Sequence, residues 1–150
     1  MHTVFTIGHG RLPFEEFLAN LKRHEVGLLI DVRSYARSRW PQYNGAALER
    51  ALLAADIGYE HLPDCGGKLA AMPQDLSRGI DRILELADET TVAIMCSEGK
   101  PLTTHVLPRA NCHRTTMLSI PLKKRGADVI HILPDGSVIE LDEERVPSEW

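Results

Sequence analysis

Residue types that serve as nucleophiles and proton carriers gather in the second half of the sequence. Cys96 ends an apolar run, Glu98 follows two residues later, and Cys112 directly precedes His113. A thiolate can attack an electrophile, while a carboxylate or an imidazole can move protons as general base and acid. Cys112 lies near the start of an expected helix, where the helix dipole would stabilise its thiolate. These residues predict acid–base chemistry, with Cys96 as the candidate nucleophile.

The first half of the chain adds a histidine, a carboxylate and a group of arginines. His9 lies between two glycines, which let the backbone approach a ligand closely, and Asp31 follows an apolar run. Both are further catalytic candidates. Guanidinium groups and hydroxyls suit phosphate or carboxylate oxygens. The candidate substrate-binding residues are Arg33, Ser34, Arg37, Ser38, Arg39, His61, Gly66, Gly67 and Arg114.

Each candidate also has a structural interpretation. A cysteine at the end of a buried strand is often a small apolar core residue. Asp31 could cap a loop or pair with an arginine, and surface arginines are often simply solvated. Trp40 and Tyr43 could stack on a base or belong to the core.

A metal site is a further alternative. Cys96, Cys112 and His113 could act as zinc ligands. However, the sequence has no pair of cysteines two residues apart, and the segment from Cys96 to Cys112 is long and contains prolines. Zinc therefore remains an alternative cofactor, and no other cofactor is indicated.

Hydrophobic periodicity predicts the elements that position these residues. We expect strands at residues 3–8, 26–32, 59–62, 91–96, 127–133 and 137–141, the last two forming a hairpin. Helices are expected around residues 14–21, 46–55 and 75–87. A fourth helix should begin near Asn111, and Pro121 should end or kink it. The loop at residues 99–111 is long for such a connection.

Strands alternating with helices predict a single three-layer α/β/α domain with a mostly parallel sheet and a C-terminal β-hairpin. In such sheets, ligands bind beyond the carboxyl ends of the strands, where the strand order reverses. Most of the candidate residues follow the expected strands directly. We therefore expect the strand ends to bring them together.

Composition sets further limits. The chain has 150 residues and a net charge of -4, and residues 140–150 alone carry five acidic residues against one arginine. We therefore expect a domain without net charge at residues 1–139 and an acidic tail at 140–150.

No apolar run approaches the roughly 20 residues of a membrane span, so we expect no membrane partner. Three cysteines do not make a disulfide framework, and we expect a cytoplasmic location.

The order and spacing of these motifs resemble the DUF488 family over residues 3–136. The motifs are Thr6-Ile7-Gly8-His9, Asp31-Val32-Arg33-Ser34, Arg37-Ser38-Arg39, Tyr59-x-His61-Leu62, Gly66-Gly67, Met95-Cys96-Ser97-Glu98, Cys112-His113-Arg114 and Val129-Ile130-His131-Ile132-Leu133. The resemblance implies a compact α/β domain with a shared polar site, but no particular reaction. The sequence departs from the family pattern at Ala36, at Cys65 and in the length of the stretch from Glu98 to Cys112.

A fainter likeness to rhodaneses and cysteine-based phosphatases has less support. Those families need an arginine soon after the cysteine, in a loop whose backbone N–H groups hold the anion. Here Cys96 is followed by Ser97-Glu98-Gly99-Lys100, where Glu98 would repel an oxyanion.

Three possible functions follow. The first is an enzyme, a hydrolase or transferase acting on an anionic substrate such as a nucleotide or nucleic acid. The second is a non-catalytic module that binds a phosphorylated ligand or nucleic acid, with the cysteines in the core. A zinc or redox site is the third possibility. Neither the substrate nor the oligomeric state follows from the sequence.

Overall fold

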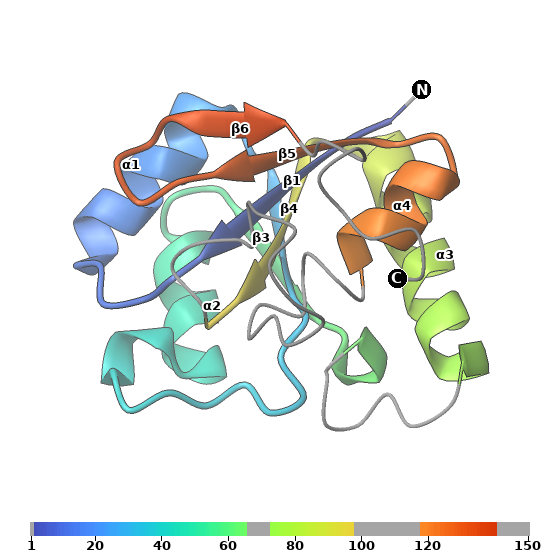
Figure 1. Cartoon of the computed structure of the whole chain (residues 1–150). Coiled ribbons are helices and arrows are strands. Elements are labelled where there is room, and N and C mark those ends of the chain that lie inside the picture. The colour runs from blue at the N-terminus through green and yellow to red at the C-terminus, as the bar shows by residue number, and fades with distance from the viewer. Residues whose placement is uncertain (1, 66–72, 98–117, 141–150) are drawn as a thin grey trace, which may run out of the picture.

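A parallel sheet lies at the centre of the protein (Figure 1). The computed structural model describes residues 2–65, 73–97 and 118–140. In these ranges six strands form one sheet in the order β3-β2-β4-β1-β5-β6. The strands are β1 (Thr3–Gly8), β2 (Leu28–Asp31), β3 (Gly58–His61), β4 (Val92–Cys96), β5 (Asp128–Ile132) and β6 (Val138–Glu140). All neighbouring pairs are parallel except β5 and β6, which form the expected antiparallel hairpin.

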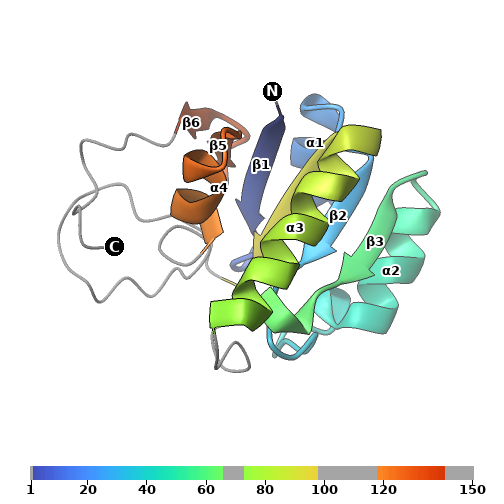
Figure 2. The same cartoon turned by 90° about the vertical axis from the view of Figure 1, so that its right-hand side faces the viewer.

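Helices cover both faces of the sheet, as the periodicity predicts. Helices α1 (Phe14–Arg23) and α2 (Gly45–Leu53) lie on one face, while α3 (Pro73–Glu89) and α4 (Ile120–Lys124) lie on the other (Figures 1 and 2). Two short 3-10 helices, η1 (Pro41–Tyr43) and η2 (Pro63–Cys65), belong to the connections. The three-layer α/β/α arrangement is therefore confirmed.

The two faces of the sheet have separate cores because side chains alternate along each strand. Leu29, Ala93 and Met95 pack in one core with residues of α1 and α2. Ile30 and Ile94 pack in the other core with residues of α3 and α4. These will be called the α1/α2 core and the α3/α4 core. A residue at a strand end therefore reaches one face or the other, according to its place in the alternation.

Pro121 does not end its helix, and residues 118 and 119, directly before α4, are π-helical. Pro121 lies in the first turn of α4, which continues to Lys124. A proline is tolerated there because the N–H groups of the first turn have no partner within the helix. The expected start of this helix near Asn111 lies outside the described residues.

The strand order reverses between β1 and β4. From β1 the chain crosses to β2 through α1, and β2 leads to β3 through α2. The connection from β4 leads the opposite way across the sheet, to β5, and it includes α4 on the other face. The carboxyl ends of β1 and β4 are thus neighbours from which the chain departs to opposite faces. This is the position where open α/β sheets bind ligands.

The last element that the structure describes is β6. Glu140 ends β6, and residues 141–150 of the expected tail lie outside the described residues. In the ranges described here, no helix combines the length and apolar character needed to cross a membrane.

Candidate functional site at the strand ends

Hydrogen bonds tie the strand-end loops together at the reversal point. The backbone N–H of His9 donates to the Cys96 carbonyl at 3.2 Å, and that of Gly10 to the Ser97 carbonyl at 3.0 Å. On the other side of β4, the N–H of Val32 donates to the Met95 carbonyl at 3.0 Å. The structure therefore brings the backbones of His9, Asp31 and Cys96 to one edge of the sheet.

The side chains at this edge separate onto the two faces. Asp31 stands opposite Met95 in the register of β2 and β4, one residue before Cys96. Met95 packs in the α1/α2 core, whereas Cys96 belongs to the α3/α4 core and has 0% of its surface exposed. The structure therefore places Cys96 in a core, on the face opposite Asp31.

Asp31 and Arg33 form a buried ion pair. Arg33 Nε and Nη2 donate to the two carboxylate oxygens of Asp31 at 2.8 and 2.7 Å, and Tyr59 Oη donates at 2.6 Å. The Arg33 backbone N–H adds a fourth bond at 3.1 Å. Asp31 is 0% and Arg33 5% exposed. Both structural interpretations of Asp31 are therefore observed, since its carboxylate pairs with the Arg33 side chain and also caps the loop through the Arg33 N–H.

Burial and pairing both change the pKa values of Arg33 and Tyr59. Burial by itself lowers the pKa of Arg33, but the hydrogen bonds and charge of Asp31 outweigh it and raise the pKa above its ordinary value. Burial and the hydrogen bond to Asp31 raise the pKa of Tyr59. The Arg33 guanidinium therefore stays charged and the Tyr59 hydroxyl stays protonated at neutral pH.

The same arginine braces the loop that follows β2. Arg33 Nη1 donates to the Arg37 carbonyl at 3.3 Å, and His61 Nε2 donates to the Arg33 carbonyl at 2.6 Å. Further along, the Ser38 N–H donates to Asn44 Oδ1 at 2.7 Å. His61 and Ser38 thus act on the backbone of the loop. Ser34 is buried beside Arg33.

Arg37 and Arg39 point to solvent. Both are exposed, and the guanidinium of Arg39 lies 5.7 Å from the centre of the Trp40 ring. In the described part of the chain, neither forms an ion pair. Of the candidate anion-binding arginines described by the structure, these two are available to a ligand.

His9 is buried against an aromatic ring. Its imidazole is 3% exposed and stacks on Tyr43, with ring centres 4.4 Å apart and planes 12° from parallel. Tyr43 Oη in turn donates to the Leu12 carbonyl at 2.6 Å, which joins the loop after β1 to η1. His9 and Tyr43 therefore hold together the loops that follow β1 and β2.

The hydrogen bonds of His9 define its tautomer. Nδ1 lies 2.9 Å from the Gly10 carbonyl oxygen, which can only accept, so Nδ1 carries the proton. Nε2 of the neutral ring then holds a lone pair. Nε2 is buried and has no hydrogen-bond partner among the described residues. Burial lowers the pKa of His9, the charge of Arg33 adds to this, and the bond to Gly10 opposes it.

Several predicted site residues lie outside the described residues. They are Gly66, Gly67, Glu98, Cys112, His113 and Arg114. The zinc alternative involves two of them, and Cys96 is the one zinc candidate that the structure describes. Within the described ranges, no three histidine, cysteine or acidic side chains lie close enough to hold a metal ion.

Two tyrosines complete this site in roles that the sequence did not predict, although Tyr43 was expected either to stack on a base or to belong to the core. Tyr59 binds Asp31, and Tyr43 carries His9. Tyr59 belongs to the Tyr59-x-His61 motif, and that spacing on a strand was an available signal for a shared face. Tyr43 gave no comparable signal, because its contact with His9 depends on how two loops pack.

The fold and the strand-end site thus define an α/β protein with polar groups at the reversal point of a parallel sheet. Residues 13–74 match the family model described as Domain of unknown function DUF488. This match confirms the resemblance to that family, from α1 to the start of α3. Comparisons with curated proteins and with solved structures found no match.

Proposed function

We propose that the protein is an enzyme in which His9 acts as general base on an anionic substrate bound at the ends of β1, β2 and β4. The observation that carries the proposal is the Nε2 lone pair of His9. It is buried at the reversal point of the sheet and has no donor among the described residues. A buried acceptor without a donor costs about 1–3 kcal/mol. A substrate or a nucleophilic water that donates there would remove this cost.

The state of His9 suits this role. A general base must be deprotonated at the working pH, and burial lowers the pKa of His9 from its ordinary value. The Gly10 carbonyl fixes the tautomer and stabilises the positive charge that forms when Nε2 takes a proton. Tyr43 holds the plane of the ring by stacking. These contacts support a pre-oriented base.

The chemical step is hydrolysis or group transfer. Nε2 of His9 takes the proton of a water or hydroxyl group while its oxygen attacks the electrophilic atom of the substrate. The bond to the leaving group breaks, and the imidazolium returns the proton to that group. The exposed guanidiniums of Arg37 and Arg39 would bind the negative charge of the substrate.

The other candidate residues take different parts in this proposal. Asp31 and Arg33 are positioning residues, because they bind each other and the loop backbone. Cys96 takes no part as nucleophile, because its side chain is buried in the core of the opposite face.

The test is His9→Gln, which removes the base, beside His2→Gln. His2 pairs with Asp88 and directly precedes β1, at the opposite end from His9. Both variants are screened with wild type on nucleoside phosphates and oligonucleotides. We expect His9→Gln to lower turnover roughly 10²- to 10⁴-fold and His2→Gln to leave it unchanged. Equal turnover by His9→Gln and wild type would contradict the proposal, and saturable binding without turnover would favour a binding module.

A further inference from the structure

We infer that the loop after β2 binds the sugar-phosphate backbone of a single-stranded nucleic acid and leads the strand to His9. This inference rests on the proposed function, since it names the class of its anionic substrate. It is carried by Tyr35, Arg37 and Arg39, which will be called the arginine–tyrosine edge. Tyr35 is 56% exposed, and both arginines are exposed as well.

The arginine–tyrosine edge has a defined inner and outer side. Ala36, Ser38 and Trp40, which alternate with the edge residues, are partly buried. The Ala36 carbonyl accepts from the N–H of Gly45 at 2.9 Å, and Ser38 Oγ accepts from the N–H of Trp40 at 3.0 Å. With the bond from the Ser38 N–H to Asn44, these contacts hold the inner side. The outer side is therefore presented on a braced backbone, which lowers the ordering cost of binding.

The segment that carries the edge has no acidic residue of its own. No acidic residue occurs between Asp31 and Glu49, and the Asp31 carboxylate is bound to Arg33. Arg37 and Arg39 form no ion pair within the described ranges, whereas Arg82 and Arg125 are held by Glu60 and Asp81. When arginines bind phosphates, counterions condensed on the nucleic acid are released. This release supplies much of the affinity of proteins for nucleic acids.

Aromatic groups beside the arginines favour a single strand over a duplex. Tyr35 is exposed, and Trp40 packs below the Arg39 guanidinium. Bases of a single strand are free to stack on such rings, whereas those of a duplex are already stacked on each other. Two guanidiniums and the Tyr35 ring on one edge can contact several linked nucleotides of a strand.

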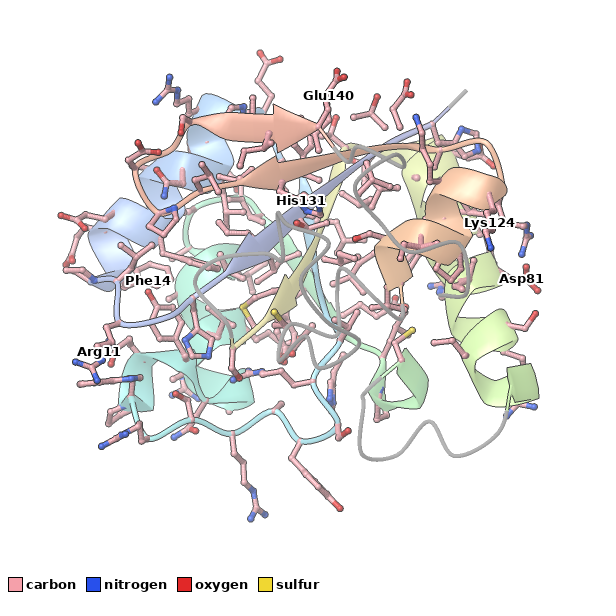
Figure 3. The ribbon with its side chains drawn as sticks, in the orientation of Figure 1. Arg11, Phe14, Asp81, Lys124, His131 and Glu140 are labelled. Atoms are coloured by element: carbon pink, nitrogen blue, oxygen red, sulfur yellow. The ribbon has the colours of Figure 1, made fainter. Side chains whose placement is uncertain are left out.

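The edge is connected to the base through η1. The N–H of Tyr43 donates to the Trp40 carbonyl at 2.9 Å, and the Tyr43 ring stacks on His9. Arg11 adds a third exposed guanidinium, in the loop after β1. Figure 3 shows Arg11 at the end of the sheet toward which β1 and β4 point. A strand bound along the edge therefore runs toward the lone pair of His9.

The experiment measures fluorescence anisotropy of labelled single-stranded RNA and DNA of about 12 nucleotides, a length that covers an ordinary single-strand site. A duplex of the same sequence and a labelled mononucleotide are the comparison probes. The variants are Arg37→Ala, Arg39→Ala, their combination and Tyr35→Ala. Arg82→Ala and Arg125→Ala are the controls, because they remove arginines that acidic residues already hold on the opposite face of the sheet.

We expect wild type to bind at least one single strand more tightly than either comparison probe. Each edge arginine variant should weaken binding and reduce the slope of log affinity against log salt by about one. Tyr35→Ala should weaken binding about fivefold or more, and both controls should bind as wild type does. Absence of strand binding, equal binding by the double variant, or equally tight binding of the mononucleotide would each overturn the inference.

The inference and the proposed function fail separately. His9→Gln should still bind the strand, because the edge is intact, while losing turnover. If strand binding depends on the edge but His9→Gln has normal turnover, the role of His9 as base is rejected and the role of the edge is retained. Conversely, if wild type does not bind the strand but His9→Gln loses turnover on mononucleotides, the role of His9 as base is retained and the role of the edge is rejected.

Discussion

The backbone N–H of His9 donates to the carbonyl of Cys96, yet the two side chains lie on opposite faces of the sheet. The imidazole stacks on Tyr43 in the α1/α2 core, and the thiol lies in the α3/α4 core. Two residues that a backbone hydrogen bond joins thus have their side chains in different cores. A thiolate–imidazole pair of the kind used in cysteine hydrolases does not form between them.

This separation predicts that Cys96 is protected from alkylation in the native protein. Its side chain is 0% exposed, so modification requires opening of the α3/α4 core. Peptide-level mass spectrometry after iodoacetamide treatment, with and without urea, measures the protection. We expect labelling of Cys96 to be slow without urea and rapid with it. Rapid labelling of Cys96 in the native protein would return it to the list of candidate nucleophiles.

Removing one partner of the buried ion pair should be strongly destabilising. Asp31→Ala leaves the Arg33 guanidinium buried without its carboxylate, and we expect a loss of about 3–5 kcal/mol in the free energy of unfolding. The matched control is Asp81→Ala, which breaks an exposed pair with Arg125. That change should cost less than about 1 kcal/mol. Urea titrations measure both, and equal losses would contradict the assigned role of Asp31.

The lowered pKa of His9 predicts how stability depends on pH. Because the folded state binds this proton less tightly than the unfolded state, the unfolded state holds more protons below the ordinary pKa of about 6.5. The contribution of His9 is therefore fully present above pH ~6.5 and is lost as pH falls through the folded-state pKa. Urea titrations at several pH values, compared between wild type and His9→Gln, isolate this term.

Nuclear magnetic resonance checks the same residue directly. A long-range proton–nitrogen spectrum at neutral pH should show His9 as the neutral ring with its proton on Nδ1, as the Gly10 contact requires. His9→Gln assigns the signal by its disappearance. A ring protonated on Nε2, or a folded-state pKa above 6.5, would argue against His9 as a base.

Gly79 in α3 should not tolerate a side chain. A Cβ at this position would meet Cys65 Sγ closer than atoms normally approach. Gly→Ala inside a helix ordinarily stabilises by roughly 1 kcal/mol, but here the overpacking should destabilise by about 1–3 kcal/mol. The second variant, Cys65→Ala with Gly79→Ala, removes the sulfur and should lose less than the sum of the single changes. A Gly79→Ala variant as stable as wild type in urea would contradict the close contact.

The fold could be predicted because apolar periodicity and layer packing leave few alternatives. The run at residues 26–32 indicates a strand covered on both faces, and β2 occupies its centre at Leu28–Asp31. Leu76, Ile80 and Ile83 recur at helical spacing, and they pack on the sheet from α3. Whether Pro121 ends a helix could not be predicted, because a proline both ends helices and begins them, and the distinction depends on where the first turn falls.

The site could be predicted only as a neighbourhood. That the strand ends converge follows from a parallel sheet, whichever residues occupy them. Which face each side chain reaches depends on the register, which sets Asp31 beside Met95 instead of Cys96. The sequence also does not reveal that Arg33 is bound by Asp31 while Arg37 remains exposed, because both follow the same strand.

The strand order also bears on how the chain folds as it is synthesised. β4 pairs with both β1 and β2, which do not pair with each other. A nascent chain that ends before Val92 therefore lacks the strand that joins β1 to β2, and β5 and β6 follow later still. Such long-range pairing slows folding and exposes edges to other chains. The strands that lead to His9 and to Asp31 are thus joined to each other only after β4 has been made.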